Sequence, residues 1–170
     1  MADTADIYIT SINGIFKQYK TLAEKALDQV GDEELNFAPD AESNSIALIV
    51  KHLSGNMLSR WTDFYTSDGE KEWRDRDSEF EGKIENKKHL LEVWEKGWAC
   101  LFQITEKLKP EDLLKTVYIR REPHTVIDAV NRQIAHYSYH IGQLIYLAKN
   151  IRSSGWKSLT IPKGESNKYK

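Results

Sequence analysis

The segment 133–143 reads QIAHYSYHIGQ and places two histidines, His136 and His140, four residues apart. On an α-helix this spacing puts both imidazoles on one face, where both can reach one metal ion. A third histidine, His52, lies far upstream in an apolar segment, and a folded bundle could bring it to the same ion. Three neutral imidazoles bind zinc, nickel or iron at about 2.0 to 2.2 Å and leave a position for water or substrate. The three histidines therefore predict an open metal site that could do chemistry.

Each of these histidines also has a simpler interpretation, as a core residue satisfied by a hydrogen bond. If all three were structural, one small core would need three separate polar partners. Tyr137 stands where metalloproteases carry a glutamate after the first histidine, so peptide hydrolysis is not predicted. The remaining histidines, His89 and His124, follow lysines and a proline respectively, and we expect surface or capping roles for them.

The composition limits the class of protein. The chain has 170 residues, enough for one domain with its own core. Lysine and arginine number 24 against 26 acidic residues, which predicts no nucleic-acid partner. The single cysteine, Cys100, excludes an intramolecular disulfide and suits a reducing compartment. No transmembrane run or signal-peptide pattern is evident, so we expect a single cytoplasmic domain over 1–170 with no membrane partner.

Apolar side chains recur at helical spacing in four segments, and no alternating stretch has convincing strand length. The pattern predicts helices from 4 to 30, from 43 or 45 to 66, from 84 to 108 and from 125 to 151. We expect Gly31 to end the first helix in a left-handed conformation, and Thr125 with Asp128 to cap the last. These helices pack most simply as an all-α four-helix bundle. A brief extended segment over 114–122 predicts a small hairpin at one end.

The connection between the second and third helices, residues 67–83, is long and dense in charge. It is long enough to run the length of a bundle, so that both helices can point the same way. The sequence therefore predicts one crossover there. The tail after Gly155 carries Trp156, Leu159 and Ile161, which we expect to dock on the bundle.

The four-helix pattern, His52 in the segment IVKHL and the pattern HxxxHxGQ over 136–143 together resemble the DinB-like superfamily. That superfamily includes YfiT-type metal-dependent hydrolases and bacterial thiol transferases. The resemblance covers essentially the whole chain and implies an up-down-down-up bundle, a divalent metal bound by His52, His136 and His140, and commonly a homodimer. Segments 54–64, 68–77 and 161–164 resemble one bacterial subgroup, and membership in it gives no substrate.

The resemblance implies either metal-assisted hydrolysis or transfer of a low-molecular-weight thiol to an electrophile, with a small molecule as substrate. Zinc or nickel is the expected ion, with iron or manganese as alternatives. No catalytic base is assigned. The opposing hypothesis is a noncatalytic dimeric interaction or stress-related protein whose metal site is vestigial or structural.

Asn56 and Arg60 follow His52 by one and two helical turns, so the same helix face could offer an amide and a guanidinium to a substrate. Helix-surface or crossover-anchoring roles are the alternative for both. Gln143 follows His140 by three residues and could orient its ring through a hydrogen bond, although a surface contact explains it equally well.

Two further arginines, Arg74 and Arg76, lie in the charged crossover. Charge runs are usually solvated surface. The alternative is a lid that brings an arginine to an anionic substrate, because the guanidinium fork suits carboxylate and phosphate groups.

Overall fold

The computed structural model describes residues 3–169. Across these residues the chain forms four α-helices, α1 (Thr4–Leu27), α2 (Ile46–Trp61), α3 (Lys87–Thr105) and α4 (Val126–Arg152). Strands β1 (Thr116–Ile119) and β2 (Glu122–Thr125) pair antiparallel as a small hairpin. The 3-10 turns are η1 (Asp32–Glu34), η2 (Asp77–Phe80), η3 (Pro110–Asp112), η4 (Ser153–Gly155) and η5 (Ser166–Tyr169). The all-α prediction is confirmed, with the hairpin as a minor addition.

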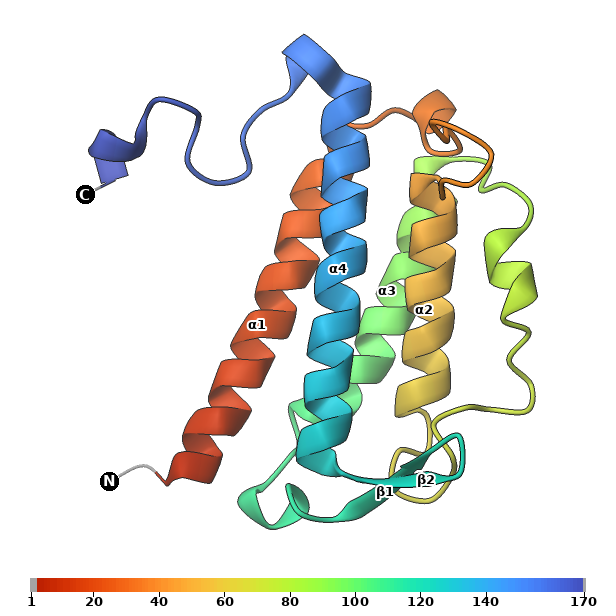
Figure 1. The fold of residues 1–170 in the computed structure, drawn as a ribbon, viewed down its shortest axis with the longest axis vertical. Helices are drawn as coiled ribbons and strands as arrows, with labels where there is room; N and C mark the ends of the chain where they lie inside the picture. Colours follow the sequence, from red (N-terminus) through yellow and green to blue (C-terminus); the bar gives the residue numbers. More distant parts are fainter. Residues whose placement is uncertain (1–2, 170) are drawn as a thin grey trace.

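The helices have the up-down-down-up order. In Figure 1, α1 and α4 run in one direction, whereas α2 and α3 run in the opposite one. α2 packs mainly against α3, and α1 against α4. The connection from α2 to α3 returns along the outside of α2 to the far end of the bundle (Figure 1), and η2 within it contacts α2. The predicted crossover is therefore present.

Polar side chains set the first residue of three helices. Ser45 accepts a hydrogen bond from the Leu48 amide at the start of α2, and Thr125 and Asp128 form a capping box at the start of α4. The side chain of Asn86 accepts from the His89 amide, so α3 begins at Lys87 and the predicted start at residue 84 is wrong.

The end of α1 also differs from the expectation. The helix stops at Leu27 rather than at Val30, and the amides of Gln29 and Val30 close tight turns onto it. Gly31 has a φ of −86° and an extended conformation, so the predicted left-handed stop is wrong.

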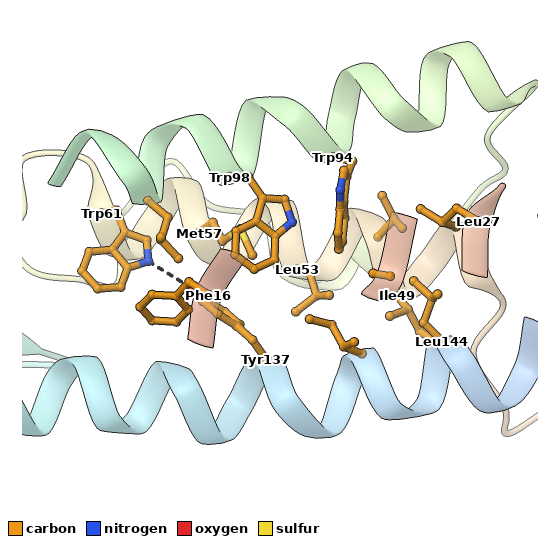
Figure 2. Close-up of a cluster of buried hydrophobic side chains, with 14 of the residues drawn as sticks. Phe16, Leu27, Ile49, Leu53, Met57, Trp61, Trp94, Trp98, Tyr137 and Leu144 are labelled. Carbon is orange, nitrogen blue, oxygen red and sulfur yellow. Dashed lines mark hydrogen bonds between the residues drawn. The ribbon is translucent and has the colours of Figure 1, made fainter. Parts of the chain in front are cut away.

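Aromatic side chains from all four helices fill one end of the core (Figure 2). Phe16 of α1 meets Trp61 and Trp98 edge to face, with ring centroids 6.4 and 6.5 Å apart. Tyr137 of α4 is fully buried beside them, and its hydroxyl accepts a hydrogen bond from Trp61 Nε1 at 3.1 Å. Burial of these large rings stabilises the packing of α4 against α2. None of the helices in the described part of the chain is long and apolar enough to cross a membrane.

Hydrogen bonds attach the crossover to α2 at several points. Ser59 of α2 donates to the Gly69 carbonyl and accepts from the Lys71 amide, both at 3.0 Å. Lys51 donates to backbone carbonyls of Ser78 and Glu81 near η2. These bonds give the charged connection a defined path over the surface of α2.

The C-terminal tail is attached at its first residues. Trp156 and Leu159 are partly buried and pack against the core, whereas Ile161 is exposed. The Gln29 side chain bonds both the amide and the carbonyl of Lys157. Docking of the tail therefore holds for Trp156 and Leu159 but not for Ile161.

Candidate metal centre

The structure brings His52, His136 and His140 together between α2 and α4. His52 comes from α2 and the other two from successive turns of α4. One ring nitrogen from each lies within 4.8 Å of the other two. His52 Nε2 lies 3.3 Å from His136 Nε2. The packing of α2 against α4 thus brings His52 to the histidine pair of α4, although 84 residues separate it from His136 in the sequence.

Two of the rings have a partner that fixes their orientation. His52 Nδ1 lies 2.9 Å from Glu79 Oε2, and His140 Nδ1 lies 2.9 Å from Gln143 Oε1. Both partners are acceptors, so each Nδ1 carries the proton and each Nε2 carries a free lone pair. Gln143 thus contacts the ring that it is predicted to orient, and the orienting role stays a prediction.

Burial keeps the two rings of α4 neutral. Burial first, and then the neighbouring histidines, lower the pKa of His136 to about 3 and that of His140 to about 4. Neutral imidazole is the form that binds a metal ion. At neutral pH the cluster is therefore ready to bind a cation without first losing protons from these two rings.

The observed geometry fits a divalent ion. A tetrahedral ion with Zn–N bonds of about 2.0 to 2.1 Å holds two ligand nitrogens roughly 3.3 Å apart. This is the separation of His52 Nε2 and His136 Nε2. His140 Nε2 is buried and has no hydrogen-bond partner within residues 3–169, which is costly unless another group uses its lone pair. A cation bound by the three nitrogens would satisfy it.

A buried ion-pair network contacts the Nδ1 side of the His52 ring. Glu79 is 7% exposed. Arg74 donates hydrogen bonds to both of its oxygens, with Nε 2.7 Å from Oε1 and Nη2 2.9 Å from Oε2. Burial raises the pKa of Glu79, but the hydrogen bonds from His52 and Arg74 outweigh it and the net pKa is lowered. Gly55 leaves the space for this carboxylate, since a Cβ there would lie 2.1 Å from Glu79 Oε1. The crossover thus supplies a charged acceptor for the first histidine.

The other residues predicted around the histidines border a pocket of about 230 Å³ beside His52 and His136. Asn56 lines it, and its Oδ1 accepts a hydrogen bond from the buried Tyr137 hydroxyl at 3.2 Å. Arg60 and Arg76 also line it. Arg74 borders the same space, but its guanidinium is engaged by Glu79 and by Glu70. Arg74 therefore lies in position to hold Glu79 in place.

Sequence reasoning missed three residues at this site. Glu79 has no signal in the sequence, because only the path of the crossover brings it to His52. Arg120 reaches the pocket from the hairpin and Arg132 from α4. Arg132 precedes His136 by one helical turn, and that spacing could have revealed it. His89 is exposed and His124 is half-buried in the hairpin, and neither belongs to the cluster.

Comparison with solved structures identifies the fold. A crystal structure of a DinB-like protein from Bacillus cereus ATCC 10987 superposes with a TM-score of 0.57 at 15% identity, covering 88% of this chain and 97% of that one. The chain is a DinB-like four-helix bundle. It belongs to the family described as "Protein of unknown function (DUF1572)", whose model matches residues 3–165. No curated protein matches it.

Proposed function

We propose that this protein is a divalent-metal enzyme in which His52, His136 and His140 bind the ion and leave one side open to a small reactant. The observation that carries this proposal is the convergence of three ring nitrogens within 4.8 Å, two of them with lone pairs freed by partners on Nδ1. A buried cluster of neutral histidines without such a ligand would leave His140 Nε2 unsatisfied.

Three other side chains would hold the metal-binding histidines in position. Glu79 accepts a hydrogen bond from Nδ1–H of His52 and so keeps its Nε2 turned inward, and Gln143 does the same for His140. Arg74 holds Glu79 in place. The three neutral nitrogens would leave a bound divalent ion its full charge, and such an ion would lower the pKa of a water or thiol bound to it. Nitrogen ligands of this kind suit zinc or nickel first.

The reaction is either hydrolysis or transfer of a low-molecular-weight thiol to an electrophile. The same three histidines serve both, since each reaction needs an activated nucleophile at neutral pH. This pair of reactions comes from the resemblance to the DinB-like superfamily, whose members include hydrolases and thiol transferases. The pocket beside His52 and His136, at about 230 Å³, suits a small molecule in either case.

Metal analysis of protein purified without a histidine tag tests the proposal. We expect one equivalent of zinc or nickel in wild type, and its loss in the double variant His136→Ala/His140→Ala. The matched control is His89→Ala, which removes an exposed histidine outside the cluster and should keep its metal. Equally low metal in wild type and the double variant under replete conditions would remove the basis of the enzyme hypothesis and favour a noncatalytic dimeric protein.

Activity assays on metal-loaded protein then distinguish the two reactions. Simple esters and amides are tested alone, and electrophiles are tested with small thiols. Thiol-dependent consumption of an electrophile indicates transfer, and thiol-independent cleavage indicates hydrolysis. In both cases activity should follow metal content across the histidine variants.

A further inference from the structure

The pocket beside His52 and His136 is strongly cationic. Its lining includes five arginines, Arg60, Arg74, Arg76, Arg120 and Arg132, and no aspartate or glutamate among the described residues. Its volume is about 230 Å³. Two of the proposed metal ligands form part of the same wall. A molecule in this space would therefore meet positive charge on several sides while touching the metal centre.

Arg60 is the least expected member of this group. It is 4% exposed, and its Nε and Nη1 are buried with no hydrogen-bond partner in the described chain. Gly69 makes room for it, since a Cβ at Gly69 would lie 2.5 Å from Arg60 Nη1. Burial lowers the pKa of Arg60, Tyr137 and Glu70 oppose this shift, and Arg132 and Arg74 add to it. Arg60 forms no direct ion pair within residues 3–169, and a buried guanidinium without a direct partner is costly, so this position is suited to an anion.

The remaining arginines differ in how much of their charge is already neutralised. Arg74 is engaged by Glu79 and Glu70, and Arg120 shares Glu70 at 3.2 Å. No ion pair is found for Arg76 or Arg132 within residues 3–169. The uncompensated charge therefore belongs chiefly to Arg60, Arg76 and Arg132, which come from α2, the crossover and α4.

The hairpin turn that carries Arg120 is held in an unfavourable conformation. Arg120 and Arg121 have φ values of 54° and 66°, a region that favours glycine or asparagine in two-residue turns. The Asp68 carboxylate accepts both of their backbone amides, at 2.8 and 2.6 Å. The crossover thus stabilises a strained turn that holds an arginine at the pocket, and strain of this kind is typical of functional sites.

We propose that this pocket binds the oxyanion group of a small substrate, a carboxylate or a phosphate, beside the metal centre. The guanidinium fork matches both groups, and Arg60 supplies the buried charge that would lie at the base of the contact. The inference deepens the proposed function by naming its substrate class, and the anion contact is made by side chains that are present without a metal.

Calorimetry on EDTA-treated protein tests this inference, with inorganic phosphate and with succinate as separate titrants. We expect saturable binding of at least one, and the tighter of the two identifies the oxyanion. Arg60→Gln should weaken binding at least tenfold. Because Arg60 is buried, the exposed Arg132→Gln is the second variant and should weaken binding severalfold without affecting the fold. Arg152→Gln, with the same charge change outside the pocket, should bind as wild type does.

Two results would overturn the anion pocket. One is no binding of either anion to metal-free or zinc-loaded protein. The other is binding that is unchanged in folded Arg60→Gln and in Arg132→Gln, which would place the anion on the metal or elsewhere. Zinc content measured on parallel samples that were loaded with zinc and not treated with EDTA separates this inference from the proposed function. Zinc without anion binding rejects only the pocket, and anion binding without zinc rejects only the metal centre.

Discussion

The carboxylate of Glu79 lies 2.9 Å from Nδ1 of His52, although the two residues are 27 positions apart in the chain. Both side chains are buried, and Arg74 binds both oxygens of the same carboxylate. A carboxylate in this position fixes the tautomer and the angle of a metal-binding histidine. The crossover between α2 and α3 is therefore structurally continuous with the proposed metal centre.

Replacing this carboxylate should weaken metal binding. We expect Glu79→Gln to lower zinc affinity about 10- to 100-fold, since the neutral amide holds His52 and Arg74 less firmly. Competition against a chromophoric zinc chelator measures the change. Glu81→Gln removes an exposed charge two residues away and should leave the affinity unchanged. Equal affinities for the two variants would contradict the role of Glu79.

Gly55 allows the same carboxylate to approach α2. In Gly55→Ala the new Cβ would lie 2.1 Å from Glu79 Oε1, so the carboxylate must move and zinc affinity should fall on the order of tenfold. The matched control is Gly142→Ala on α4, where no atom lies within 4 Å of the new Cβ. It should keep zinc affinity and gain up to about 1 kcal/mol of stability from helix propensity. Unchanged zinc affinity in Gly55→Ala would show that the close approach of Glu79 to α2 is not needed for metal binding.

The metal-free protein should lose stability in mild acid. The folded pKa values of His136 and His140 are about 3 and about 4, below the ordinary value of 6.5 that applies to the unfolded chain. Between these values the unfolded chain binds more protons, so the free energy of unfolding is at its full value above 6.5 and falls as the pH drops toward 4. Urea unfolding in EDTA at several pH values measures this slope.

The histidine variants give the control for that slope. His136→Ala/His140→Ala should flatten the pH dependence, because the two groups with lowered pKa values are gone. His89→Ala should retain the wild-type slope, because that side chain is exposed. The prediction fails if the double variant and wild type lose stability in parallel.

The buried hydroxyl of Tyr137 joins the aromatic core to the pocket. It accepts from Trp61 Nε1 and donates to Asn56 Oδ1, so Tyr137→Phe leaves both groups unsatisfied. We expect a loss of about 1 to 3 kcal/mol in the free energy of unfolding, measured by urea. Tyr146→Phe removes an exposed hydroxyl from the same helix and should have no effect. A Tyr137→Phe variant as stable as wild type would reject this account.

Local patterns in the sequence predicted the helices well and their ends less well. Helical periodicity identifies the four segments because each buries one stripe. The ends depend on single side chains, so Asn86 moved the start of α3, and tight turns after Leu27 removed the need for a left-handed Gly31.

The sequence by itself determined the fold class and the histidine pair, since the spacing of His136 and His140 already places them on one helix face. Tertiary structure alone decided which distant groups join them. Glu79 meets His52 because the crossover is tied to α2, and Arg120 meets Arg132 at one pocket because the hairpin folds back on the start of α4. Such contacts depend on the path of the chain through space, which helical periodicity does not encode.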